Sequence, residues 1–127
     1  MATTIQQFFS FYLDGLRRQQ ADVLADCHCV PVLVASPAGQ VVLSDREQVL
    51  DHCHKLLARA AEEGLRAERF TIRSSLLLGD EFAVANVAWS MLAPNHGMKT
   101  FHTAYNLRRA HGDWTIWAVT THEELNG

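Results

Sequence analysis

The first sixteen positions carry apolar residues with the period of an α-helix. Positions 5, 8, 9, 12, 13 and 16 are apolar and fall on one face of such a helix. Thr4, with Gln7 three residues later, matches a capping box at its start. The pattern predicts an amphipathic helix, followed by a shorter helical stretch with Val23, Leu24 and Cys27 on one side.

Two short strands and a longer helix are predicted next. The apolar residues between positions 30 and 43 are β-branched and surround the turn sequence Ser-Pro-Ala-Gly at 36–39. Ser44-Asp45-Arg46-Glu47 then reads as a capping box that begins with Ser44. Apolar residues at 49, 50, 53, 56, 57 and 60 predict a helix over 45–63, which Gly64 would end.

The second half of the chain predicts four longer strands, at 66–78, 81–93, 99–109 and 113–121, separated by turn residues. The last strand is apolar on both faces, because Trp114, Ile116 and Ala118 alternate with Trp117 and Val119. Both faces of this strand therefore need cover.

The order of helices and strands predicts an α+β fold, with an antiparallel or mixed sheet that carries its helices on one face. The length of 127 residues and the 48% apolar content suit one domain over 1–127 with a proper core.

Composition excludes several classes of partner. Fourteen acidic and eleven basic side chains give a net charge of −3, so no basic field is available for nucleic acid. No stretch has the roughly 18 apolar residues of a membrane span, and no signal peptide is recognisable. Three cysteines, an odd number, suit reduced thiols in the cytoplasm. No Gly-rich loop opens a helix after a strand, and we expect no cofactor.

The chain resembles the NTF2-like superfamily in its order of elements, in the Ser-Asp-Arg-Glu helix start and in the pattern Tyr-Asn-Leu-Arg-Arg followed by Gly-Asp-Trp-Thr-Ile at 105–116. That superfamily includes ketosteroid isomerase, scytalone dehydratase and SnoaL-like polyketide cyclases. The resemblance implies a cone, in which a curved sheet wraps around three N-terminal helices and encloses a cavity, and commonly a dimer. It does not imply one reaction.

The resemblance also suggests catalytic candidates. Tyr12 stands where ketosteroid isomerase has a tyrosine that donates a hydrogen bond to the developing oxyanion, although a core aromatic would show the same pattern. The carboxylate base of that enzyme is replaced here by Ser36, which cannot take a proton from carbon at neutral pH. Scytalone dehydratase draws attention to the histidines, of which His102 and His28 could border a pocket. Alternation favours Tyr105 over His102 as the inward residue.

We expect a largely apolar cavity. Alternation puts Thr115, Trp117, Val119 and Thr121 on one face, where the two threonines would supply hydroxyls to an otherwise apolar wall. The residues predicted to bind a ligand are Tyr12, Ser36, Trp89, Phe101, Thr103, Tyr105, Trp117, Val119 and Thr121. Such a cavity suits a small hydrophobic or aromatic molecule, held by a binding protein or acted on by a lyase- or isomerase-type enzyme. The pattern equally fits a non-catalytic dimerising module whose cavity is filled by aromatic side chains, and the choice stays open.

Two clusters of cysteine and histidine suggest zinc by their residue types, Cys27-His28-Cys29 and His52-Cys53-His54. Their spacing argues against it, because the two histidines of the second cluster would point to opposite sides of Cys53 on a helix. We expect no metal site.

A homodimer is the expected assembly. If Trp117 and Val119 face the cavity, Trp114 and Ile116 lie on the convex face of the sheet, where no helix of the same chain covers them. Leaving each exposed forfeits about 1.5 to 3 kcal/mol. Twofold pairing of the sheets would bury both residues.

Overall fold

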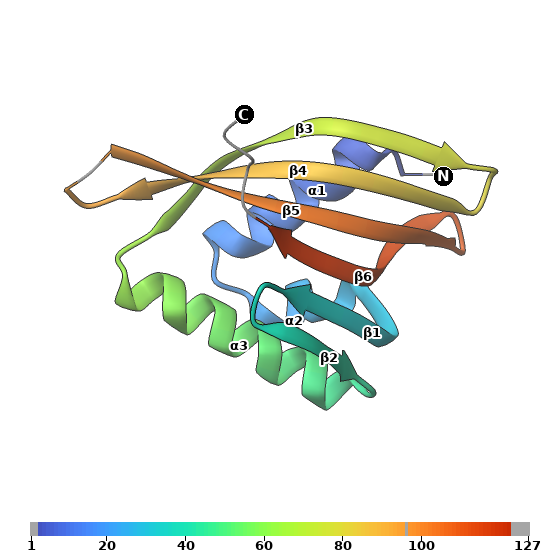
Figure 1. The fold of residues 1–127 in the computed structure, drawn as a ribbon, viewed down its shortest axis with the longest axis horizontal. Helices are drawn as coiled ribbons and strands as arrows, with labels where there is room; N and C mark the ends of the chain where they lie inside the picture. The colour runs from blue at the N-terminus through green and yellow to red at the C-terminus, as the bar shows by residue number, and fades with distance from the viewer. Residues whose placement is uncertain (1–2, 96, 123–127) are drawn as a thin grey trace.

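The computed structural model describes residues 3–95 and 97–122, and the chain there forms three helices and one sheet (Figure 1). The helices are α1 (Ile5–Arg17), α2 (Ala21–Asp26) and α3 (Arg46–Glu62). The strands are β1 (His28–Ser36), β2 (Gly39–Leu43), β3 (Arg66–Leu78), β4 (Phe82–Ala93), β5 (Gly97–Ala110) and β6 (Asp113–His122). Their order in the sheet is β2-β1-β6-β5-β4-β3, and only β1 and β6 run parallel. The predicted α+β cone with a curved mixed sheet is confirmed.

The ends of the helices follow local side-chain chemistry. The capping box of α1 is present, because Gln7 N donates to Thr4 Oγ1 at 3.0 Å and Thr4 N donates to Gln7 Oε1 at 2.9 Å. The start of α3 is one residue later than predicted. Asp45, not Ser44, is the N-cap, and its carboxylate accepts from Gln48 N at 2.9 Å. A carboxylate at this place also interacts favourably with the positive end of the helix dipole.

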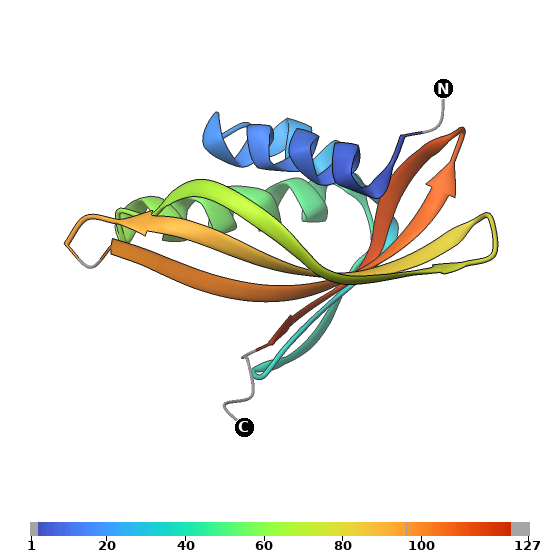
Figure 2. The same ribbon diagram turned by 90° about the horizontal axis from the view of Figure 1, so that it is seen from above.

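The helices α1 and α3 lie over the same face of β3, β4 and β5, as Figure 2 shows from above. We call this the inner face of the sheet. It carries Trp89 on β4 and Tyr105 and Leu107 on β5. In the strand register Tyr105 lies between Ala85 and Val119, and Leu107 pairs with Ile116. Phe9 of α1 packs here with its ring centroid 4.9 Å from that of Tyr105 and 6.1 Å from that of Trp89. The main core therefore lies between α1 and the inner face.

A β-bulge at Trp117 overturns the predicted register of β6. Asn106 pairs with Ala118 and Leu107 pairs with Ile116, so Trp117 is an extra residue in its strand. The bulge shifts the alternation by one position. Trp114 and Ile116 are therefore buried, with 2% and 0% of their surface exposed, and Trp117 is 39% exposed.

The placement of Trp114 and Ile116 on the convex face was thus wrong. Strict alternation from Val119 back to Trp114 holds only for an unbroken ladder, and the bulge lies between these two residues. Val119 packs against the core on the inner face, as expected. Among the helices of the described residues, none is long and apolar enough to cross a membrane.

Candidate functional site

A cavity of about 310 Å³ lies between the C-terminal halves of α1 and α3 and the inner face of β4, β5 and β6. We call it the inner cavity. The helices and the C-cap of α3 contribute Tyr12, Leu16, Leu56, Leu57, Arg59, Ala60 and Glu63 to its lining, and the chain from Leu65 onward contributes Leu65, Trp89, Met91, Phe101, Thr103, Tyr105 and Thr121. Its lining is mostly apolar, with hydroxyl groups on one side and charged groups from α3 on the other.

Three aromatic residues form the buried part of this lining. The ring centroid of Tyr12 lies 5.6 Å from that of Trp89 and 6.2 Å from that of Tyr105. Trp89 Nε1 donates a hydrogen bond to Tyr105 Oη at 2.9 Å, which holds both rings in place. The Tyr12 side chain is only 5% exposed, and its hydroxyl makes no hydrogen bond with any other residue that the structure describes. A hydroxyl of a cavity-lining residue that has no protein partner is available to bind a molecule in the cavity.

Both phenols stay protonated near neutral pH. Burial raises the pKa of Tyr12 well above its usual value, and the neighbouring Tyr105 raises it further. Burial also raises the pKa of Tyr105, against the opposing effect of its hydrogen bonds with Trp89 and Thr103. A neutral phenol donates a hydrogen bond but is no base, so these groups suit an acceptor atom on a ligand.

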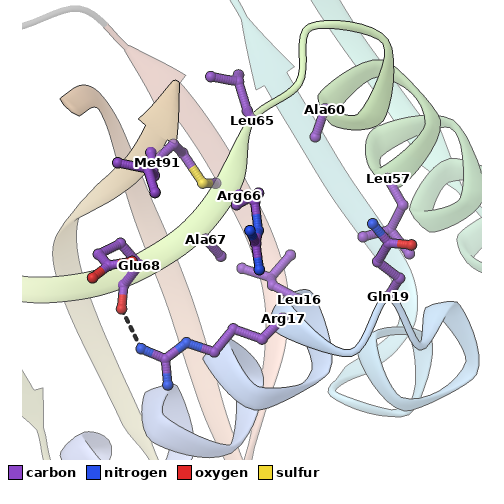
Figure 3. A pocket seen from close by; sticks show the side chains of 11 residues that line it. Leu16, Arg17, Gln19, Leu57, Ala60, Leu65, Arg66, Ala67, Glu68 and Met91 are labelled. Carbon is purple, nitrogen blue, oxygen red and sulfur yellow. Dashed lines mark hydrogen bonds between the residues drawn. The ribbon is translucent and has the colours of Figure 1, made fainter. Parts of the chain in front are cut away.

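A second cavity of about 460 Å³ adjoins the first, and we call it the outer cavity (Figure 3). Five half-buried apolar residues line both cavities, and we call them the apolar collar: Leu16, Leu57, Ala60, Leu65 and Met91. Beyond the collar the lining of the outer cavity becomes charged, with Arg17 from α1 and Arg66 and Glu68 from β3. Arg17 Nη2 donates to the backbone oxygen of Glu68, which ties the end of α1 to β3.

Comparison with known protein families shows to which family the chain belongs. The sequence model of the family described as "NTF2-like protein (DUF6841)" matches residues 2–124. This chain belongs to the NTF2-like family. The narrower likeness to SnoaL or ketosteroid isomerase stays a prediction.

Solved structures agree on the fold of this NTF2-like protein. A domain of unknown function with a cystatin-like fold from Nostoc punctiforme has a TM-score of 0.75 and 14% identity, over 98% of this chain and 81% of that one. An NTF2-like protein of unknown function from Shewanella oneidensis has a TM-score of 0.73 and 15% identity, over 94% and 96% of the two chains. At such identities the likeness shows the fold alone. None of the curated proteins matches the sequence.

Six of the nine residues predicted to bind a ligand line the inner cavity, and three do not. Tyr12, Trp89, Phe101, Thr103, Tyr105 and Thr121 line it, and whether they bind a ligand stays a prediction. Val119 packs nearby against the core without reaching the cavity. Trp117 was placed wrongly because of the bulge. Ser36 was also wrong, because it lies exposed at the β1–β2 turn, where its Oγ accepts from Ala38 N at 3.2 Å.

His102 lies outside both cavities in this NTF2-like protein. It pairs with Ala88 and His122 on the face of the sheet opposite Tyr105, and its ring centroid is 5.8 Å from that of His122. His122 in turn is hydrogen-bonded to Asn86, with 3.0 Å between Nε2 and Oδ1. The candidate role of His102 as a base for a ligand in the cavity was therefore wrong, because the pleat turns its side chain away.

The sequence did not identify the contribution of α3 to the site. Its apolar stripe predicts core residues throughout, yet only Val49 and Cys53 are fully buried in this helix. Leu56 is 40% exposed, and together with Leu57 and Ala60 it borders the inner cavity. The signal that could have shown this is the charged pair Arg59 and Glu63 beside the stripe, since a fully buried helix end would not carry it.

The cysteine and histidine clusters are packed into the fold. Burial raises the pKa of the Cys27 thiol to about 12 and that of the Cys53 thiol to about 11, so neither is the thiolate that zinc needs. His28 Nδ1 donates to the backbone oxygen of Leu24 at 2.8 Å. Within residues 3–95 and 97–122, no group of three or more metal-ligating side chains comes together. The expectation that the protein binds no metal and no cofactor stays a prediction.

Proposed function

We propose that the protein binds a small, largely apolar molecule in the inner cavity and holds it by a hydrogen-bond acceptor on its buried end. The observation that carries this proposal is Tyr12, a residue of the cavity lining that is only 5% exposed and whose hydroxyl has no protein partner among the described residues. Tyr12 Oη is not among the fully enclosed polar atoms without a partner in the described residues, so it reaches open space and can donate to an acceptor there. An apolar lining with few convergent polar groups is typical of a small-molecule site.

The same geometry favours binding over catalysis. A lyase or isomerase acting on a carbon-bound proton needs a general base beside the ligand. The two phenols are held neutral by burial, and Glu63 is the one carboxylate in the described lining, on the exposed residue that caps the C-terminus of α3. We therefore propose a binding protein. The free thiols of Cys27, Cys29 and Cys53 support a cytoplasmic location as part of this proposal.

Titration with 2-acetylnaphthalene, a flat neutral ketone, tests the proposal. We expect saturable binding at one site per chain, followed by calorimetry or by the change in tryptophan fluorescence. Tyr12→Phe removes the donor and should weaken binding about fivefold, as expected for one neutral hydrogen bond. Naphthalene is the matched control, because it has no acceptor and its affinity should not change in Tyr12→Phe. A ketone that binds no better than naphthalene, or an unsaturable signal, would refute the proposal.

An exposed apolar patch on the other face of the sheet favours a second role, as a dimerising module. Trp117 and Val42 are 39% and 55% exposed. Leu33 of β1 pairs with Val42 of β2 and with Ala118 of β6, the residue after Trp117, so it lies between Val42 and Trp117 in the sheet. We propose that this patch, in place of Trp114 and Ile116, pairs with its copy in a homodimer. A twofold assembly buries the same patch on both chains and is the commonest closed form.

Sedimentation at micromolar concentration tests the dimer. We expect the wild type to sediment as a dimer and Trp117→Glu as a folded monomer. Thr100→Glu, a change at an exposed residue of β5 beyond the end of β6, should leave the dimer intact. A wild-type monomer would refute the proposal.

A further inference from the structure

The outer cavity carries an excess of positive charge. Two guanidinium groups, those of Arg17 and Arg66, face one carboxylate, that of Glu68, in its lining. Figure 3 shows Arg17 and Arg66 on separate elements, at the end of α1 and the start of β3. Arg66 makes no hydrogen bond or ion pair with any residue in the described part of the chain, so its donors are available.

Arg17 is held in place toward the same space. One of its nitrogens, Nη2, is used in the hydrogen bond to the backbone oxygen of Glu68. Nη1 and Nε remain, since a guanidinium has five N–H donors. A guanidinium that is already fixed on one side loses less freedom when it binds a second group, which makes it a better anion ligand than a freely moving side chain.

The apolar collar joins this charged region to the inner cavity. Its five side chains line both cavities, so an apolar molecule lying along them would have one end near Tyr12 and the other near Arg66. The polar groups at the two ends differ in kind. In the inner cavity neutral hydroxyls stand on the sheet side and Arg59 is accompanied by the opposite charge of Glu63, whereas two guanidiniums with one carboxylate stand at the outer end.

We propose that the ligand is an apolar monocarboxylate, with its acceptor-bearing end in the inner cavity and its carboxylate between Arg17 and Arg66 in the outer cavity. This inference rests on the proposed function. A carboxylate matches the planar fork of a guanidinium and is bound through charge-assisted hydrogen bonds. Glu68 beside the two arginines leaves one net positive charge, which suits a singly charged group better than a phosphate dianion.

The test compares 6-acetyl-2-naphthoic acid with its amide, 6-acetyl-2-naphthamide. The two have the same shape and the same ketone and differ in charge at the other end. At pH 7.5 and low salt we expect the acid to bind about tenfold tighter, as typical of a charge-assisted hydrogen bond. The advantage should shrink as salt is added, because the outer cavity is open to water.

Three variants locate the effect. Arg66→Gln should remove most of the preference for the acid and leave the affinity for the amide unchanged. Arg17→Gln should do the same, and a circular dichroism spectrum and melting curve would show that loss of its bond to Glu68 has not disturbed the fold. Arg69→Gln is the matched control, because Arg69 is an exposed arginine on the same strand that lines neither cavity.

The outcomes separate this inference from the proposed function. Equal affinities for acid and amide, or a preference that survives in both Arg66→Gln and Arg17→Gln, would overturn the inference and leave the binding of 2-acetylnaphthalene standing. Failure of acid, amide and 2-acetylnaphthalene alike to bind would remove the proposed function and the inference with it.

Discussion

The two ends of the inner face are built from the same strands but differ in how well they are filled. At the end near the β5–β6 turn, Leu107 and Ile116 are completely buried and Trp114 is 2% exposed. Thr3 closes this end, with its N donating to Gly112 O at 3.2 Å and its Oγ1 to Asp113 Oδ1 at 2.6 Å. At the other end the residues of the apolar collar are only half-buried around an unfilled space. The closed end therefore supplies stability, and the open end is available for binding.

The largest expected effect is a loss of packing at the closed end. Ile116→Ala should lower the free energy of unfolding by about 2 to 5 kcal/mol, because the side chain is completely enclosed and its neighbours cannot fill the space. Leu57→Ala, at the open end, should cost only about 1 kcal/mol, since Leu57 is half-buried and already borders a cavity. Urea unfolding measures both, and equal losses would contradict the contrast.

Alanine substitutions at two glycines with the same backbone conformation distinguish the cost of backbone strain from that of a steric clash. Gly64 and Gly79 have φ of +68° and +67°, so an alanine at either place costs about 1 to 2 kcal/mol. A Cβ at Gly64 would also lie 2.6 Å from Pro94 Cγ, whereas one at Gly79 meets nothing within 4 Å. Gly64→Ala should therefore be the more destabilising in thermal unfolding. The reverse order would show that the contact with Pro94 is easily relieved.

The free energy of unfolding should decrease as the pH is lowered, because burial favours the neutral form of His28. Burial lowers the pKa of His28, against the opposing hydrogen bond to Leu24, and His52 nearby lowers it further. The folded protein thus binds this proton less readily than the unfolded chain. Its stability is full above the unfolded pKa of about 6.5 and is lost as the pH falls from there towards the folded pKa.

Melting curves at pH 7.5 and pH 5 measure this loss. His28→Asn should reduce the difference in melting temperature between the two pH values, because asparagine does not titrate and its amide can still donate to Leu24. His54→Gln is the control, since His54 is exposed on α3, and it should leave the difference as in the wild type. An undiminished difference in His28→Asn would assign the loss to other groups.

The smallest effect on stability is expected from filling the open end. Leu57→Trp adds volume next to the inner cavity and should change the free energy of unfolding by less than about 1 kcal/mol while abolishing binding of 2-acetylnaphthalene. Ala83→Leu adds volume on the inner face opposite Leu107, where Ala83 is 1% exposed, and should cost about 1 to 3 kcal/mol. Similar costs for both would mean that the inner cavity is not available space.

Part of the candidate site could be predicted because it depends on local pattern. Tyr12 belongs to the apolar stripe of α1. Thr103 and Tyr105 alternate with His102 along β5, and the register confirms that Thr103 and Tyr105 share the inner face while His102 lies on the other. The α3 residues of the cavity could not be predicted in this way. Val49 and Leu56 belong to the same stripe but are 1% and 40% exposed, because burial depends on which other elements, α2 foremost, pack against each part of the helix.

The sequence by itself determined the elements of this protein, because caps, stripes and turn residues act over a few positions of the chain. It also determined the NTF2-like fold, since the order of these elements restricts how they can pack. Only the tertiary structure decided which residues of β6 face inward. That depends on the bulge at Trp117, which lies in the pairing of β6 with β5, on the strand that also pairs with β1 from the first third of the chain. A bulge is a property of the pairing between two strands and leaves no periodic trace in the bulged strand itself, so the faces of Trp114 and Trp117 could be known only once the sheet was assembled.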